Sequence, residues 1–297
     1  MVDRQDWQAL ASAVSAATGR RFRAEDARAV GGGCISSAYR VEGDGACYFV
    51  KTGPLARRGM FEAELEGLEA IRASRTLAVP RPLMAGASGD TAWLVLEFLV
   101  LGGSAGTAGA QLGEGLAALH AQAGESFGWA RDNFIGATPQ PNQASDNWVA
   151  FLGEQRLGFQ LDLAARNAAP ARLETQGRLL IEALPAFFTD YQPHPALLHG
   201  DLWGGNWGVL ASGEPVVFDP AVYRGDREAD IAMTELFGGF GADFHIAYRH
   251  HLPLDAGYST RRDLYNLYHL LNHFNLFGGG YARQALAVTE RLLAELG

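Results

Sequence analysis

The spacing of apolar residues predicts a small sheet in the first third of the chain. Residues 5–18 show the helical period, whereas the stretch 27–53 alternates strand-like runs with turns. The helical period returns over 57–74, where four apolar side chains recur on one face. Residues 79–99 then predict two strands joined by a turn. We therefore expect a small sheet with a long helix in the first hundred residues.

The rest of the chain has a different pattern. The glycine-rich stretch "LGGSAGTAG" (101–109) is typical of a joint, and mainly helical segments follow it. Two short apolar runs, "NWGVL" and "PVVFD" (206–219), flank "ASGE" and predict a hairpin. We predict an α+β fold with two lobes, a small β-rich N-terminal lobe over 1–100 and a larger, mainly helical C-terminal lobe over 101–297.

Composition narrows the classes of partner. The chain has 297 residues and a formal net charge of −9, which argues against nucleic-acid binding through a broad basic surface. No apolar run approaches the ~20 residues that span a bilayer. Its two cysteines, Cys34 and Cys47, make neither a disulfide framework nor a zinc site. We predict a cytoplasmic protein, monomeric by default, with no membrane or nucleic-acid partner.

A glycine-rich loop carries the first candidate chemistry. In "LLHGDLWGGNWG" (197–208), Asp201 and Asn206 are five residues apart, and Asp219 follows thirteen residues later. Phosphoryl transfer to an alcohol needs a carboxylate that accepts the hydroxyl proton, and an amide and a second carboxylate that hold Mg²⁺. Each residue alone is also a common turn or cap residue. The three in this order predict a catalytic Asp201 and a metal site at Asn206 and Asp219.

The predicted N-terminal lobe offers a phosphate clamp. Lys51 ends the apolar strand "CYFVK", a position from which a lysine reaches the α- and β-phosphates of a nucleotide when a helix glutamate holds it. Of the glutamates in 57–74, Glu64 falls within the apolar stripe of the helix. A glutamate on a buried face needs a cationic partner, since an unpaired buried charge is costly. We therefore predict a Lys51–Glu64 pair.

Two backbone segments complete the predicted nucleotide site. "VGGGCISS" (30–37) contains Gly32 and Gly33, whose amides can cover phosphates, although the run departs from G-x-G-x-x-G at its third glycine. Position alone suggests that the backbone of Glu97, Phe98 and Leu99, beside the joint, pairs with adenine.

Three further residues keep alternative interpretations. His199 suits a structural hydrogen-bonding role better than that of a base. Asp230 opens a helix, where it either matches the helix dipole or braces the catalytic loop. Trp203 lies between Asp201 and Asn206 and either packs on the large lobe or stacks on the face of a sugar.

These residues carry a family likeness. "HGDLWGGN" and "FDPAVYRGDREADIAMTELFGGF" resemble the fructosamine kinase (ketosamine-3-kinase) family, which belongs to a protein-kinase-like group with aminoglycoside and choline kinases. "MFEAELEGLEAI", "NFIGATPQPN", "FLGEQRL" and "LYNLYHLLNHFNLFGGGY" fit the same family. The resemblance extends over nearly the whole chain.

The resemblance implies an ATP- and Mg²⁺-dependent kinase of bilobal, protein-kinase-like fold. Its substrates would be ketosamine adducts (ribulosamine, erythrulosamine or fructosamine on lysine or other amines, in glycated proteins or small molecules), phosphorylated on the sugar 3-hydroxyl as a deglycation repair. It implies the roles given above for Asp201, Asn206, Asp219, Lys51 and Glu64. It also implies an adenine hinge at residues 97–99 and a tryptophan that faces the sugar. The alternatives are a kinase of the same fold for an aminoglycoside, choline or a free sugar, and a non-catalytic nucleotide-binding protein.

Overall fold

The chain divides into two compact units. The computed structural model describes residues 4–31, 36–104 and 106–296. Unit 1 comprises Met1–Ala108 and Gly208–Asp219, and unit 2 comprises Gly109–Trp207 and Pro220–Gly297. Unit 1 thus continues eight residues past the expected boundary and includes a segment that we expected in the C-terminal lobe.

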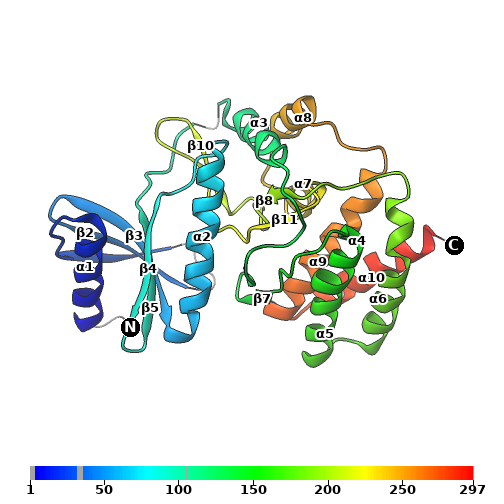
Figure 1. The fold of residues 1–297 in the computed structure, drawn as a ribbon, viewed down its shortest axis with the longest axis horizontal. Helices are drawn as coiled ribbons and strands as arrows, with labels where there is room; N and C mark the ends of the chain where they lie inside the picture. Colours follow the sequence, from blue (N-terminus) through cyan, green and yellow to red (C-terminus); the bar gives the residue numbers. More distant parts are fainter. Residues whose placement is uncertain (1–3, 32–35, 105, 297) are drawn as a thin grey trace. The chain divides into compact units, whose positions relative to one another are not determined.

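Unit 1 is built on an antiparallel sheet with the strand order β1-β2-β3-β5-β4 (Figure 1). Its elements up to the joint are α1 (Arg4–Thr18), β1 (Asp26–Val30), β2 (Ser37–Gly43), β3 (Ala46–Pro54), η1 (Leu55–Arg57), α2 (Arg58–Ser74), β4 (Pro82–Ser88) and β5 (Thr91–Glu97). The predicted strands and the helix expected over 57–74 are confirmed.

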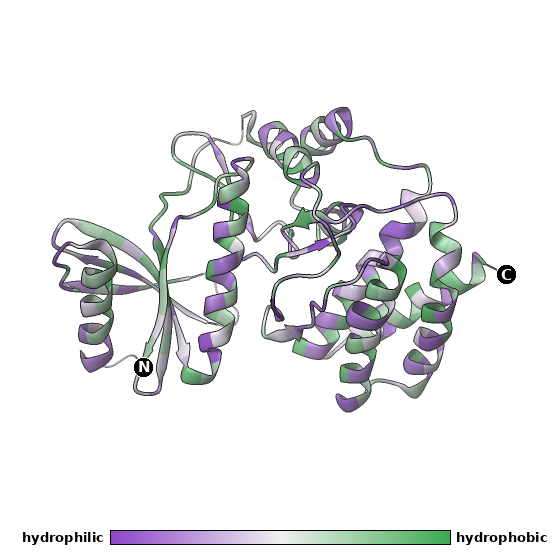
Figure 2. Cartoon of the chain, in the orientation of Figure 1, coloured by the Kyte–Doolittle hydropathy of each residue, from purple (hydrophilic) through white to green (hydrophobic). Residues whose placement is uncertain are grey.

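Alternation along the strands divides the side chains of the sheet between two helices. On β5, Trp93 and Val95 pack with residues of α1, whereas Leu94 and Leu96 pack with residues of α2. Successive side chains of a strand point to opposite faces, so each helix covers one face of the sheet. Figure 2 shows α2 banded in hydrophilic and hydrophobic positions, as expected for a helix with one face on a sheet.

The hairpin β9 (Trp207–Val209) and β10 (Pro215–Val217) is confirmed. Backbone pairing explains why most of it belongs to unit 1. Val216 forms a parallel bridge with Ala78, and Leu210 forms an antiparallel bridge with Leu101 at the start of the joint. Hydrogen bonds between residues so far apart in the sequence leave no local signal, and periodicity could not reveal this grouping.

Unit 2 is mainly helical, and its core is packed with side chains from α9 and the helices beside it. Its elements are α3 (Ala108–His120), β6 (Asn133–Ile135), β7 (Thr138–Gln140), α4 (Trp148–Phe151), η2 (Leu152–Gly158), α5 (Phe159–Arg166), α6 (Ala171–Ala183), η3 (Leu184–Phe188), β8 (Ala196–Leu198), β11 (Tyr223–Gly225), α7 (Glu228–Leu236), α8 (Ala242–His251), α9 (Tyr258–Phe277) and α10 (Tyr281–Ala294). In the described part of the chain, no helix combines the length and apolar character needed to cross a membrane.

Candidate active site

Lys51 and Glu64 form an ion pair in unit 1. On β3, Val50 faces α1, so the next residue, Lys51, points to the face that α2 covers. Its Nζ lies 2.7 Å from Oε1 of Glu64, and both side chains are 12% exposed. Strand alternation and helix periodicity together account for this pair.

Asp219 is the third member of this cluster. It follows β10, and its Oδ1 lies 2.6 Å from Nζ of Lys51. The backbone of Asp219 has φ 57°, in the left-handed region that few residues other than glycine adopt. Such backbone strain persists where surrounding structure fixes it, and it is concentrated at functional sites.

The Lys51 ammonium group lies between two carboxylates, and this arrangement shifts the pKa values of Lys51 and Glu64. Burial lowers the pKa of Lys51, but the charges of Glu64 and Asp219 outweigh it and raise the pKa above its ordinary value. Burial raises the pKa of Glu64 to about 7, and the charge of Asp219 adds to this rise against the lowering effect of Lys51. Because Nζ lies within hydrogen-bond distance of both acids, we take Lys51 as a cation held between them.

The candidate catalytic loop of unit 2 starts with a sharp turn after β8. The backbone N–H of Ala221 donates to the carbonyl of His199 at 2.8 Å, just beyond the paired residues of β8 and β11. Gly200 then has φ 82°, and a Cβ at this position would lie 2.0 Å from the carbonyl oxygen of Ala221. Only glycine fits this close approach of backbones, which directs the chain into Asp201.

Asp230, at the start of α7, holds the turn. Its Oδ2 accepts a hydrogen bond from the backbone N–H of His199 at 2.7 Å, and its Oδ1 accepts one from Gly200 at 2.9 Å. Nε2 of His120 lies 3.1 Å from the same Oδ2. Burial raises the pKa of Asp230, but the hydrogen bond with His120, the electrostatic interactions with His120 and His199 and the amide of Gly200 outweigh it, so the pKa is lowered. Of the two interpretations of Asp230, a match to the helix dipole or support of the catalytic loop, these contacts favour the second.

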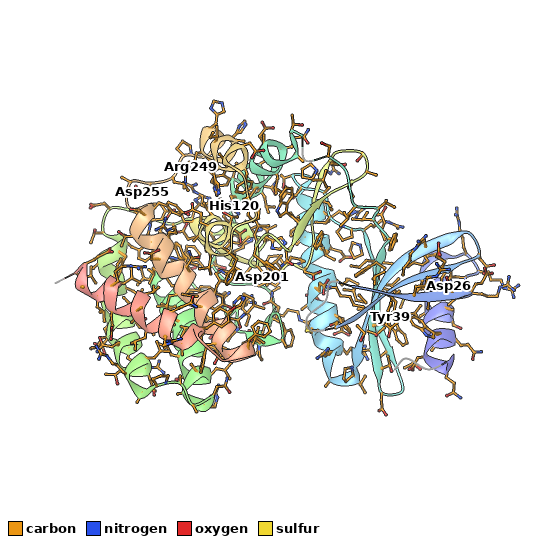
Figure 3. All side chains as sticks on the ribbon, turned by 180° about the vertical axis from the view of Figure 1, so that it is seen from behind. Asp26, Tyr39, His120, Asp201, Arg249 and Asp255 are labelled. Carbon is orange, nitrogen blue, oxygen red and sulfur yellow. The ribbon has the colours of Figure 1, made fainter. Side chains whose placement is uncertain are left out.

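Further bonds inside the loop fix Asp201 relative to Asn206. Nδ1 of His199 accepts from the backbone N–H of Asp201 at 3.3 Å, the structural role expected for this histidine. The side-chain nitrogen of Asn206 donates to the carbonyl of Asp201 at 2.9 Å and approaches its Oδ2 at 3.3 Å. Figure 3 labels Asp201 and His120, which both belong to unit 2. The loop thus holds a carboxylate and an amide in a defined arrangement.

Trp203 lies on the surface of this loop. Its side chain is 40% exposed, and its ring covers Gly205, where a Cβ would meet ring atoms at 2.2 Å. Gly204 makes a second close approach, since a Cβ on Gly239 would lie 2.6 Å from its Cα. The exposed indole is compatible with stacking on a sugar, while glycines allow the loop to pack closely on the segment after α7.

The remaining predicted nucleotide contacts belong to unit 1. Glu97 ends β5, where its N–H donates to the carbonyl of Arg81 at 2.9 Å and its carboxylate accepts from the N–H of Arg81 at 3.2 Å. The Phe98 ring lies 5.0 Å from the guanidinium carbon of Arg40. Gly32 and Gly33 lie outside the described residues.

Of the two residues predicted to hold the metal, Asp219 belongs to unit 1 and Asn206 to unit 2. Carboxylate and amide oxygens are the hard donors that Mg²⁺ prefers, so the chemistry of this donor set fits the ion. Among residues 4–31, 36–104 and 106–296, no cluster of three or more His, Cys, Asp or Glu could hold a metal.

Sequence reasoning missed His120 and Tyr248. His120 is fully buried at the end of α3, and its Nδ1 lies 2.9 Å from the hydroxyl of Tyr248 on α8. A polar residue within the apolar run "LAALHAQ" was the available signal for His120. Tyr248 left no such signal, because a tyrosine in a helix is ordinary core material.

Comparison with known proteins identifies the family and the fold. The model of the family described as fructosamine kinase matches residues 6–295. "Probable ketoamine kinase" of Synechocystis sp. is 47% identical over 97% of each chain. The chloroplastic "Protein-ribulosamine 3-kinase" of Arabidopsis thaliana is 44% identical over 90% of this chain and 82% of its own.

Solved structures agree with this match. "Putative fructosamine-3-kinase" from Haemophilus somnus 129PT superposes with a TM-score of 0.89 at 26% identity, over 97% of each chain. Aminoglycoside phosphotransferase APH(4)-Ia, at 16% identity and a TM-score of 0.60 over 91% of this chain and 93% of its own, shares the fold alone. The predicted α+β kinase-like class is therefore confirmed. Within that class, the chain belongs to the fructosamine kinase family.

Proposed function

We propose that this chain is an ATP-dependent ketosamine-3-kinase, which transfers the γ-phosphoryl group to the sugar 3-hydroxyl of ketosamine adducts on lysine or other amines. The observation that carries the proposal is 44–47% identity to proteins named ketoamine kinase and protein-ribulosamine 3-kinase, over at least 90% of this chain. The phosphorylated adduct then breaks down and frees the amine, which makes the activity a deglycation repair.

In this proposal unit 1 binds the nucleotide. Lys51 contacts the α- and β-phosphates, and Glu64 keeps its ammonium group in place through their 2.7 Å contact. The backbone of residues 97–99 pairs with adenine, and the glycines of 30–37 cover the phosphates. Asp219, which shares Lys51 in the structure, and Asn206 would hold Mg²⁺, which would neutralise charge on the phosphates.

Unit 2 supplies the chemistry at the acceptor. Asp201 orients the 3-hydroxyl and accepts its proton while the hydroxyl oxygen forms a bond to the γ-phosphorus and the bond to the ADP oxygen breaks. Asp230 and His199 keep the loop in position through the contacts described above. Trp203 offers its exposed face to the sugar.

ADP release from a substrate panel tests the proposal. The panel contains a peptide with ribulosamine-lysine, fructosamine-lysine, kanamycin and choline, each with ATP and Mg²⁺. We expect turnover of a ketosamine, with NMR of the product placing phosphate on the 3-hydroxyl. Preference for kanamycin or choline would instead identify a small-molecule kinase of the same fold, and ATP binding without turnover of any acceptor would identify a non-catalytic protein.

Two variants make the panel specific to the site. Asp201→Asn should reduce ADP release by orders of magnitude with every acceptor, and Asp190→Asn, at an exposed acid of the same unit, should match the wild type. Equal activity of Asp201→Asn and the wild type would show that turnover arises elsewhere. The cytoplasmic location, the monomeric state and the choice between glycated proteins and small ketosamines stay predictions.

A further inference from the structure

A buried chain of polar side chains continues from the catalytic loop to α8. Asp230 binds the backbone of the loop, His120 binds Asp230, and the hydroxyl of Tyr248 lies 2.9 Å from Nδ1 of His120. Nη1 of Arg227 donates to the same hydroxyl at 3.3 Å. The first three side chains are at most 2% exposed, so their hydrogen bonds compete with no water.

One order of donors satisfies every contact in this chain. Arg227 can only donate, so the oxygen of Tyr248 accepts from it. The hydroxyl proton of Tyr248 is then directed to Nδ1 of His120, and the proton on Nε2 is directed to Asp230. Burial raises the pKa of Tyr248, which keeps this hydroxyl protonated as a donor. The hydroxyl therefore fixes the tautomer that allows His120 to donate to Asp230.

Close packing of α3 on α8 makes this reach possible. A Cβ on Gly113 of α3 would lie 2.3 Å from the carbonyl oxygen of Phe244 on α8. Gly113 lies seven residues, or about two turns, before His120 and so shares its face. A side chain at position 113 would force α8 away from α3 and carry Tyr248 with it.

The segment that leads into α8 also contacts the loop directly. Gly239 packs on Gly204 so closely that a Cβ on it would lie 2.6 Å from the Cα of Gly204. The indole N–H of Trp207 donates to the carbonyl of Gly239 at 3.2 Å. The loop is therefore linked to this part of unit 2 at two points, directly through Gly239 and indirectly through the hydrogen bonds from Asp230 to His120 and Tyr248.

We propose that Tyr248, oriented by Arg227, is a positioning residue for the catalytic loop and acts through His120 and Asp230. Its hydroxyl keeps the amides of His199 and Gly200, and with them Asp201, in the arrangement needed for phosphoryl transfer. The catalytic consequence rests on the proposed kinase function. The structural consequence does not, because the order of the loop can be measured without substrate.

Tyr248→Phe removes the hydroxyl and keeps the ring. We expect turnover per nucleotide-binding site to fall about tenfold, because the buried hydrogen bond from Tyr248 to His120 is lost. KM for both substrates should stay within about twofold of the wild type. Hydrogen–deuterium exchange of the peptide covering residues 198–202 should accelerate by a similar factor.

Tyr258→Phe is the matched control. Tyr258 is also buried, and its hydroxyl donates to Glu235 near the end of α7, away from the loop contacts. The Tyr258→Phe variant should lose a similar amount of stability, but its turnover and its hydrogen–deuterium exchange over residues 198–202 should match the wild type. If Tyr248→Phe leaves loop exchange and turnover unchanged, or if both variants alter them equally, the positioning role is overturned.

Gly113→Ala gives a second route that removes no hydroxyl. Alanine favours a helix more than glycine does, so α3 itself is not weakened, but α8 must shift. We expect faster exchange over 198–202 here too, which keeps the proposal testable if Tyr248→Phe does not fold. Unchanged exchange in Gly113→Ala would count against it. A wild type that turns over no ketosamine refutes the proposed function, while the exchange data still decide the role of Tyr248.

Discussion

Replacing Asp230 by asparagine tests whether the carboxylate holds the catalytic loop. Asp230 is 2% exposed, and its two oxygens face the N–H groups of His199 and Gly200 and Nε2 of His120. An amide keeps only one acceptor oxygen. In the wild type, Oδ2 accepts from both His199 and His120, and Oδ1 accepts from Gly200. If the amide oxygen of asparagine takes the place of Oδ2, its NH₂ group faces the N–H of Gly200. At least one buried donor must therefore lose its acceptor.

The size of the effect follows from this count. Hydrogen bonds to charged groups contribute about 1.5–3 kcal/mol each, and a buried donor left without a partner costs about 1–3 kcal/mol. Asp230→Asn loses one such bond and the negative charge, so we expect a decrease of about 2–4 kcal/mol in the free energy of unfolding. Alanine would leave all three buried donors without an acceptor and cost about 3–9 kcal/mol, close to the whole stability of a typical protein.

Urea denaturation followed by tryptophan fluorescence measures this difference. Asp263→Asn is the control, because Asp263 forms near-surface ion pairs with Arg291 at 2.6 Å and Arg262 at 3.3 Å, and such pairs contribute about 0–1 kcal/mol. Turnover should fall in Asp230→Asn and stay normal in the control. If the free energy of unfolding of Asp230→Asn falls by less than about 1 kcal/mol, as in the control, Asp230 does not hold the loop.

The pH dependence gives an independent check. The lowered pKa of Asp230 means that its contribution to stability is present above the pKa of an unfolded aspartate, about 3.9. It is lost as the pH falls through the lower pKa of the folded state. The stability difference between wild type and Asp230→Asn should therefore be constant above about pH 5 and shrink below about pH 4. A difference that grows in acid would contradict this assignment.

Three further predictions concern the proposed roles. Asp201→Asn should reduce turnover about 10²–10⁴-fold with ATP affinity nearly intact, and turnover close to wild type in single-turnover assays would refute its role as base. Asp219→Ala should weaken the Mg²⁺ requirement and nucleotide affinity together in ADP titrations across Mg²⁺ concentrations, and unchanged Mg²⁺ dependence would count against a metal ligand. Trp203→Ala should raise KM for the ketosamine more than KM for ATP, whereas equal changes would indicate that the ring only packs.

The site residues that the sequence could identify are those fixed by local patterns. The period of two on β3 and the helical period of α2 place Lys51 and Glu64 on facing surfaces, so their pairing follows from residue spacing alone. The loop 199–206 could be identified from its polar residues among glycines. The left-handed φ of Gly200 explains why glycine is needed there, although its angle could not be read from the sequence.

Contacts between distant segments could not be predicted in this way. Lys51 and Asp219 are 168 residues apart, and His120 and Tyr248 are 128 apart. Nothing in a strand or helix pattern states which remote segment will cover a given face. The hairpin 207–217 was predicted as a hairpin, yet its pairing with Ala78 and Leu101 was not.

The sequence by itself therefore determined the strands of the small sheet, the helix over 57–74, the hairpin at 206–219, the Lys51–Glu64 pair and the family of the protein. Only the tertiary structure decided that Asp219 shares Lys51, that segment 208–219 belongs to unit 1, and that Asp230 is linked through His120 to Tyr248. The physical reason is that periodicity is set by local backbone geometry, which repeats every two or 3.6 residues. The partner of each face is chosen by burial and hydrogen bonding over the whole chain, which local geometry does not encode.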